Sequence, residues 1–177
     1  MKIIYCVRHC EAEGQHPSAK LTERGKKQAI QLKDFFKAIP IERIVSSPYV
    51  RAIDSVKELQ LERRIPMDID VRLEERRLSS APLDDWLAKL EASFQDESIK
   101  YDGGESGKEA MNRISEVVEE IPPGTTVLVS HGNLLSLLFK RFTGNFGFRQ
   151  WKDMSNPDLY RLVLTEDGAE LERVWGL

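Results

Sequence analysis

The sequence predicts an α/β protein arranged as a three-layer sandwich, with helices on both faces of a mostly parallel sheet. Two observations predict this class. Extended β-rich runs alternate with helical patterns along most of the chain, which is typical of parallel strands joined by helices. The last two β-rich runs are instead separated only by "EDGA", which predicts a hairpin with an Asp-Gly turn and therefore an antiparallel edge.

Six segments are expected to be strands, and they cover residues 2–7, 43–46, 67–73, 125–130, 159–165 and 170–175. A first helix is expected over residues 22–38, with Thr22 as its N-cap. Its apolar positions at helical spacing are Ala29, Leu32 and Phe36. A second helix is expected to follow "SSP", with Pro48 at an early helical position. The residues expected on its inward face are Val50, Ile53, Val56 and Leu59.

Residues 78–104 differ in character and are expected to form a small cap insertion over the sheet edge. Within them, "APLDDWLAKLEASF" predicts an amphipathic helix flanked by polar, glycine-bearing sequence. We interpret its apolar stripe as core packing; the stripe consists of Trp86, Leu87, Leu90 and Phe94. Further on, "SGKE" fits a capping box that begins another helix. No repeat or linker divides the chain, so residues 1–177 are expected to form one domain.

Length and composition limit the function classes. A chain of 177 residues with 41% hydrophobic and 31% charged residues is expected to fold around one core without a metal or disulfide staple. The net charge of −3 gives no general attraction to nucleic acid, and no apolar stretch has the ~20 residues that span a bilayer. The N-terminus lacks a signal-peptide pattern, and Cys6 and Cys10 lie too far apart along a strand to form a disulfide. These features predict a cytoplasmic protein.

Reactive side chains gather at four predicted strand ends, in "VRHCE", "VSSPYVRA", "RLEER" and "LVSHGN". Ligands of open α/β sheets bind at the carboxyl ends of the strands, so we expect these segments to share one site. The pair His9-Cys10 raises the question of which residue is the nucleophile. A cysteine phosphatase loop requires an arginine six residues after the cysteine, but that residue is His16. An unactivated thiol also stays mostly protonated, which favours the histidine.

His9 suits nucleophilic attack on phosphorus, because a neutral imidazole can attack when hydrogen-bond donors stabilise the phosphoryl oxygens. Arg8 and Arg51 offer guanidinium groups that bind phosphate in a bidentate manner, and His131 offers a further donor. The amide of Gly132 opens a predicted helix, whose positive end favours an anion. The four strand ends therefore predict a phosphate site.

These motifs together resemble the histidine phosphatase superfamily, also called phosphoglycerate mutase-like proteins. "RHCEAEGQ" is similar to the first motif of the family, and "VSHGN" is similar to the motif of its second histidine. "LTERGKKQA", "SSPYVRAIDS", "RLEER" and "GGES" resemble the segments between them in the same order. The resemblance runs from residue 3 to about residue 165.

The resemblance implies that His9 becomes phosphorylated and that Arg8, Arg51 and His131 complete the phosphate pocket. It implies that Glu75, rather than the adjacent Glu74, protonates the leaving oxygen. The residues then expected near the substrate or phosphate are Gln15, Arg76, Gly132 and Asn133.

Three positions depart from the family pattern. Cys10 stands where the family usually has glycine, Ala12 replaces a threonine or serine, and Gln15 replaces an asparagine. A side chain at position 10 is expected to alter the turn or the room in the pocket. These changes bear on substrate and rate rather than on the identity of the nucleophile.

The expected function is metal-independent hydrolysis of small phosphomonoesters, with no cofactor and a small phosphorylated metabolite as substrate. The spacing of His9, Cys10, His16 and His131 matches no usual zinc pattern. Two alternatives remain: a phosphoglycerate mutase, and a non-catalytic protein that binds a phosphorylated ligand. The sequence does not indicate an oligomeric state.

Overall fold

The structure, a computed structural model that describes residues 1–176, contains one six-stranded sheet in the order β3-β2-β4-β1-β5-β6. Its strands are β1 (Lys2–Arg8), β2 (Arg43–Ser46), β3 (Met67–Ile69), β4 (Gly124–Ser130), β5 (Asp158–Thr165) and β6 (Gly168–Arg173). The first four strands in this order run parallel, whereas β5 is antiparallel to both β1 and β6. The predicted mostly parallel sheet with an antiparallel edge is confirmed.

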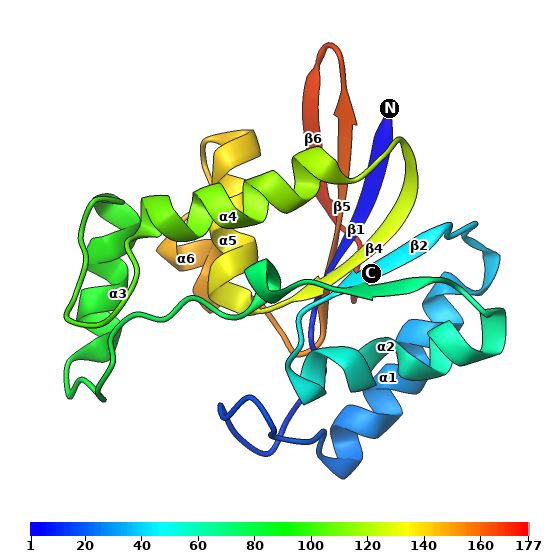
Figure 1. Cartoon of the computed structure of the whole chain (residues 1–177), viewed down its shortest axis with the longest axis horizontal. Helices are drawn as coiled ribbons and strands as arrows, with labels where there is room; N and C mark the ends of the chain where they lie inside the picture. Colours follow the sequence, from blue (N-terminus) through cyan, green and yellow to red (C-terminus); the bar gives the residue numbers. More distant parts are fainter. Residues whose placement is uncertain (177) are drawn as a thin grey trace.

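Helices cover both faces of this sheet (Figure 1). One face carries α1 (Glu23–Phe35) and α2 (Val50–Arg63), and the other carries α4 (Gly107–Glu120), α5 (Gly132–Thr143) and α6 (Phe148–Lys152). The remaining helix, α3 (Trp86–Gln95), lies beyond the first turn of α4 and away from the sheet. Short 3₁₀ helices follow α1 at Phe36–Ala38 and β3 at Val71–Leu73. The three-layer sandwich is therefore confirmed.

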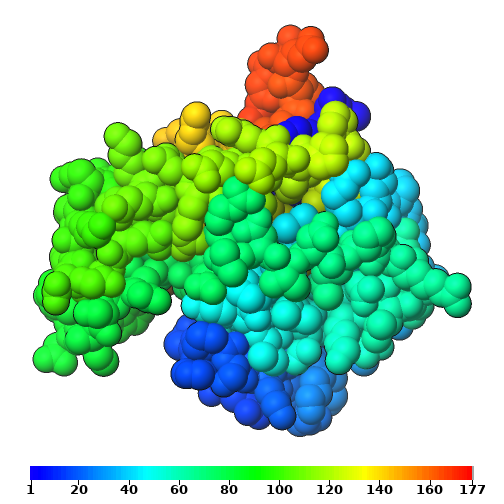
Figure 2. Space-filling view, viewed as in Figure 1, coloured from blue at the N-terminus to red at the C-terminus, as the bar shows by residue number. Residues whose placement is uncertain are grey.

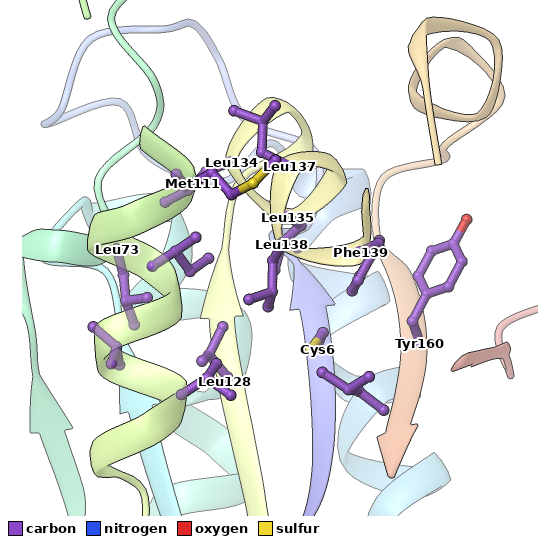
Figure 3. Close-up of a cluster of buried hydrophobic side chains, with 14 of the residues drawn as sticks. Cys6, Leu73, Met111, Leu128, Leu134, Leu135, Leu137, Leu138, Phe139 and Tyr160 are labelled. Carbon is purple, nitrogen blue, oxygen red and sulfur yellow. The ribbon is translucent and has the colours of Figure 1, made fainter. Parts of the chain in front are cut away.

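The two faces of the sheet bury two separate apolar clusters, because successive side chains of a strand point to opposite sides. Along β1, Ile4 and Cys6 belong to the cluster beneath α4 and α5, and Tyr5 and Val7 belong to the cluster beneath α1 and α2. Figure 3 shows the first cluster, with the leucines of α5 above Cys6. Burial on both sides holds the central strands β1 and β4 in place.

Several predicted elements are confirmed in detail. Thr22 caps α1, and its side chain accepts a hydrogen bond from the amide of Gly25. Ser106 and Glu109 form the capping box at the start of α4. The β5–β6 hairpin is present, although its loop residues are Glu166 and Asp167, and Gly168 already pairs with Thr165. None of the helices described has both the length and the apolar character of a membrane span.

Other predicted boundaries were wrong. The strand expected over residues 67–73 ends at Ile69, because the Asp70 side chain accepts a hydrogen bond from the Arg72 amide and starts a 3₁₀ turn. The final strand spans residues 168–173 rather than 170–175. Pro48 lies two residues before α2, which begins at Val50.

The burial of two predicted helix faces also differs from expectation. In α2, Val50 and Ile53 are only partly buried, whereas the polar Arg51 and Ser55 are buried. In α3 the predicted apolar stripe is divided. Leu90 and Phe94 are buried, but Trp86 is 50% exposed and Leu87 is 39% exposed. The first turn of α3 is therefore only partly covered: Trp86 packs edge-on against Trp151, and half of its surface stays exposed.

Candidate active site

The site forms where the carboxyl ends of β1, β2 and β4 meet. β4 lies between the other two strands, so Arg8 pairs with Ser130, and Ser46 pairs with Val129. The residues that follow continue this arrangement: the His9 amide donates to the Ser130 carbonyl, and the Ser47 amide donates to the Val129 carbonyl. Three of the predicted segments are thereby brought to one edge of the sheet, as the parallel order requires.

His9 is held as a neutral imidazole with one nitrogen facing Arg51. Its Nδ1 lies 2.7 Å from the Cys10 carbonyl oxygen, which can only accept, so Nδ1 carries the proton. Nε2 is then unprotonated and accepts a hydrogen bond of 3.1 Å from Arg51 Nε. Burial, together with the nearby guanidinium groups of Arg51 and Arg8, lowers the pKa of His9 to about 3, although the hydrogen bond to the Cys10 carbonyl acts in the opposite direction. His9 Nε2 is therefore unprotonated near neutral pH, with its lone pair hydrogen-bonded to Arg51.

Arg51 is a buried cation in the first turn of α2, and its side chain is only 1% exposed. Besides His9, its guanidinium donates to the carbonyls of Gln15 and His16, at 3.2 and 3.0 Å. The Tyr49 ring lies beneath it, 4.9 Å from the guanidinium carbon. Burial lowers its pKa, but the group remains a cation at any physiological pH. Arg51 thus ties the loop after β1 to the histidine.

His131 lies beside His9, with ring centroids 5.2 Å apart. Its Nε2 is 2.8 Å from the Ser47 hydroxyl, and the edge of the Tyr49 ring packs against it with centroids 4.8 Å apart. Burial lowers the pKa of His131 well below that of an ordinary histidine, and the neighbouring His9 and Arg51 act in the same direction. The site therefore holds two neutral imidazoles.

Arg8 reaches across the start of α5. Its Nη1 donates to the Met154 carbonyl at 2.9 Å. A Cβ at Gly132 would come within 3.0 Å of Arg8 Nε and 3.1 Å of its Cζ, so the lack of a side chain at Gly132 lets the guanidinium lie close to the helix. Burial lowers the pKa of Arg8, partly offset by Glu75 and Asp158.

Glu75 sits against the N-terminus of α5. Its carboxyl oxygens accept hydrogen bonds from the amides of Arg76, Asn133 and Leu134, at 2.8, 3.2 and 3.0 Å. The preceding chain is anchored because the Ser130 hydroxyl donates to the Leu73 carbonyl. Glu75 thereby lines the same pocket as His9, which the adjacent Glu74 does not.

Two pockets of unequal size meet at Glu75. The smaller, about 120 Å³, is lined by Arg8, His9, Glu11, Ala12, Gly14, Gln15, Glu75, Gly132 and Asn156. Ligand sites for whole small molecules have volumes of about 300–1,000 Å³, so this pocket fits only a small group such as phosphoryl. The larger, about 850 Å³, extends from Arg51 to Trp86 beneath residues 78–83, the cap loop that precedes α3.

Three buried polar atoms of the small pocket and its surroundings have no hydrogen-bond partner among residues 1–176: Arg8 Nε, His131 Nδ1 and Asn133 Oδ1. Buried polar atoms are rarely left unpaired, and such exceptions are common where a ligand binds. A phosphoryl group beside them could accept from the arginine and the histidine. Within the same residues, no group of three or more His, Cys, Asp or Glu side chains is arranged to hold a metal ion.

The remaining predicted positions lie in different surroundings. Gln15 is exposed at the rim and lines both pockets. Arg76 is 5% exposed and its guanidinium is occupied, with bonds to the Ser93 hydroxyl and the Glu105 carbonyl. Cys10 is fully buried in the cluster beneath α1 and α2, and burial raises the pKa of its thiol to about 12. An inert thiol at this position fits the histidine interpretation.

Sequence reasoning missed Asn156, which stabilises the loop after β1. Its side-chain amide donates to the His9 carbonyl at 2.8 Å, and its own carbonyl accepts from Gln28 at 2.7 Å. Gln28 in turn accepts from the Glu11 amide at 2.9 Å. The only sequence signal was the dipeptide Asn156-Pro157, and nothing in it indicated proximity to a residue 147 positions earlier.

The fold and the pocket define an α/β protein with paired histidines and arginines at the carboxyl edge of its sheet. The chain belongs to the histidine phosphatase superfamily (branch 1), whose sequence profile matches residues 4–175. This confirms the resemblance drawn from the motifs.

Relatives with known names include both mutases and phosphatases. A probable phosphoglycerate mutase GpmB from Salmonella choleraesuis is 29% identical over 164 residues, which cover 80% of this chain and 74% of that protein. Among solved structures, a mycobacterial glucosyl-3-phosphoglycerate phosphatase with inorganic phosphate has a TM-score of 0.77 at 23% identity, covering 100% of this chain and 98% of that chain. The α-ribazole phosphatase of Shigella flexneri has a TM-score of 0.76 at 19% identity, with coverages of 97% and 95%. At these identities the structural matches establish the fold.

Proposed function

We propose that this protein is a metal-independent phosphatase that hydrolyses small phosphomonoesters through a phosphohistidine at His9. The observation that carries the proposal is the state of His9: Nδ1 donates to the Cys10 carbonyl, and Nε2 is an unprotonated acceptor in contact with Arg51. That geometry leaves an unprotonated nitrogen at the wall of a pocket of phosphoryl size, and attack on phosphorus requires Arg51 Nε to transfer its hydrogen bond from His9 Nε2 to a phosphoryl oxygen. The phosphatases among the solved relatives support the same reaction class.

In the first step, His9 Nε2 attacks phosphorus and the bond from phosphorus to the ester oxygen breaks. The Glu75 carboxyl group transfers its proton to that oxygen, so that the product leaves as an alcohol. The phosphorylated imidazole carries a positive charge, and its Nδ1 proton still faces the Cys10 carbonyl at the 2.7 Å contact. Arg8, Arg51 and His131 would bind the three phosphoryl oxygens during the transfer.

In the second step, water attacks phosphorus and the bond to His9 Nε2 breaks. Glu75, now a carboxylate, takes the proton from water, and inorganic phosphate leaves. The broken bond returns its electron pair to Nε2, so His9 is again neutral, and the proton from water restores the Glu75 carboxyl group. No metal ion is needed, because the arginines and the start of α5 provide the positive charge.

The test uses an isotopically labelled phosphomonoester and rapid acid-free quenching. We expect wild-type protein to carry label in an acid-labile linkage, and His9→Asn to carry none and to lose at least about 10⁴-fold in kcat/KM. Cys10→Ser is the matched control and should keep both label and turnover. Full turnover by His9→Asn, or loss of labelling in Cys10→Ser alone, would refute the histidine nucleophile.

The mutase alternative, left open by the family resemblance, is also supported by the name of the GpmB relative. It differs from hydrolysis only in where the phosphoryl group goes, so product analysis separates the two. A phosphatase releases one inorganic phosphate for each ester consumed, whereas a mutase converts 3-phosphoglycerate without net release. A non-catalytic binding protein would show neither labelling nor release.

A further inference from the structure

Two adjacent arginines that follow Glu75 have opposite surroundings. Arg76 is buried, and the Ser93 hydroxyl and the Glu105 carbonyl accept from its guanidinium. Arg77 is exposed. Its backbone amide donates to the Glu105 carboxylate and its carbonyl accepts from the Glu105 amide, but its guanidinium has no hydrogen-bond partner among residues 1–176. Arg76 thus holds the cap to the site, and the Arg77 guanidinium remains available.

Arg77 lies at the boundary between two cavities. It lines the cavity of about 850 Å³ beneath the cap loop, and also a neighbouring cavity of about 410 Å³. Both cavities also reach Tyr49 and Glu75, so Arg77 is within the space that surrounds the proposed proton donor. A leaving group that extends from the small pocket would enter this space.

Every other arginine that lines these cavities already has partners. Arg72 binds Asp70 and Glu120, and Arg113 binds Glu105. Arg51 binds His9, as described above. Among the described residues, the Arg77 guanidinium is therefore the one guanidinium of these two cavities without a partner.

The larger cavity is suited to a negatively charged ligand. Three arginines line it, and Glu75 is the only acidic residue among its described lining residues. The carboxyl group of Glu75 is already bound by three backbone amides. The wall formed by the cap loop is mixed: it includes the apolar Leu78, Leu83 and half-exposed Trp86, together with the hydroxyl-bearing Ser79 and Ser80. Figure 2 shows the hollow between the green cap segment and the blue loop after β1.

We propose that Arg77 is a specificity-determining residue that binds a second anionic group, a carboxylate or a second phosphate, in the leaving group of the substrate. The preferred substrates are then phosphomonoesters with a second acidic group, held at the ester phosphate by the small pocket and at the other end by Arg77. The expected effect of Arg77 on turnover rests on the proposed function. The expected effect on binding does not, because ligand affinity at the two anion sites can be measured without turnover.

The experiment measures binding of non-hydrolysable phosphonates by calorimetry. One series is ω-carboxyalkylphosphonates of increasing chain length, and the reference series is alkylphosphonates of equal length. We expect the carboxylate to tighten binding roughly tenfold at one chain length, the effect of a charge-assisted hydrogen bond partly screened by solvent. Arg77→Gln should remove this preference. A bisphosphonate series of the same lengths shows whether a second phosphate is preferred to a carboxylate.

Arg141→Gln is the matched control, because it removes one exposed arginine from the far end of α5. It should keep the full preference for the carboxylate. The proposal is overturned if wild-type protein shows no preference for a second anion at any length, or if Arg77→Gln retains it.

Turnover gives a second readout that separates the two proposals. We expect the ratio of kcat/KM for a carboxylated ester to that for a neutral ester to fall roughly tenfold in Arg77→Gln. Retained binding preference without turnover of any ester would refute the proposed function and leave the role of Arg77 intact. Turnover with an unchanged ratio would refute the role of Arg77 alone.

Discussion

The pocket at His9 and the cavity beneath the cap are built in different ways. The pocket is small, and it is lined by the end of β1, the loop that follows β1, Glu75, the first residue of α5 and Asn156. The cavity is about 850 Å³, and one wall is the loop 78–83 together with the half-exposed Trp86. Groups in the pocket contact one another at hydrogen-bond distance, whereas Arg77 and Trp86 have space around them.

The difference suggests a division of tasks. Since the pocket can hold only the phosphoryl group, a change there should affect every ester by a similar factor. A change in the cavity should alter the ratio between esters, because only the leaving group reaches it. Four substitutions test this division, beginning with the largest expected effect.

Arg51→Lys should lower kcat/KM by about 10³-fold for small and large esters alike. A lysine has one nitrogen and cannot donate at once to His9, the loop carbonyls and a phosphoryl oxygen. Steady-state kinetics on methyl phosphate and on an aryl phosphate would measure the loss of kcat/KM for a small and for a large ester. A loss confined to the larger ester would contradict the proposed separation of pocket and cavity.

Glu75→Gln tests the residue that lines both the pocket and the cavity. We expect kcat/KM to fall about 10²-fold or more for an alkyl phosphate, whose alkoxide must be protonated as it leaves. The loss should be much smaller for p-nitrophenyl phosphate, whose leaving group needs no proton. Equal losses on the two esters would mean that Glu75 acts only by stabilising the start of α5, where it accepts from the Asn133 and Leu134 amides. Thermal unfolding of the same variant would detect that structural role.

Gly132→Ala should lower kcat/KM roughly tenfold for all esters, since the added Cβ would lie 3.0 Å from Arg8 Nε and must displace the guanidinium. The matched control is Gly144→Ala, which is at the other end of α5 and has no atom within 4 Å of an added Cβ. That control should lose stability rather than activity, because its φ of +75° disfavours alanine. Equal activity losses in both variants would point to general damage to α5.

Trp86→Ala should have the smallest effect, a few-fold loss in kcat/KM for aryl phosphates and little change for methyl phosphate. Half of this ring is already exposed, and it contacts Trp151 edge-on with centroids 6.4 Å apart, so removing it costs little packing. The ratio of the two kcat/KM values is the measurement. An unchanged ratio would show that the cap does not contact the leaving group.

Much of the site could be predicted because it depends on local sequence and strand order. Parallel strands bring their carboxyl ends together, and so Arg8, His9 and His131 meet as expected. Arg51 follows β2 by a short turn into α2, which limits where it can lie. The choice of His9 rather than Cys10 as the proposed nucleophile was made from residue spacing, and the burial of Cys10 is consistent with that proposal.

The cap was predicted less well. The exposure of Trp86 and the burial of Arg76, whose guanidinium is already hydrogen-bonded, were not foreseen. The burial of Arg76 depends on its meeting an acceptor in a distant segment, the Glu105 carbonyl. Loop conformation has no periodicity from which such contacts can be inferred.

The sequence by itself determined the α/β class, the order of the strands' reactive ends and the family, because hydrophobic periodicity and motif spacing are local properties of the chain. Only the tertiary structure showed which nitrogen of His9 carries the proton and that Asn156 contacts the His9 carbonyl. It also showed that the Arg77 guanidinium has no partner among the described residues. These features depend on atoms that are distant in the sequence and meet only when the sheet, α5 and the cap pack together.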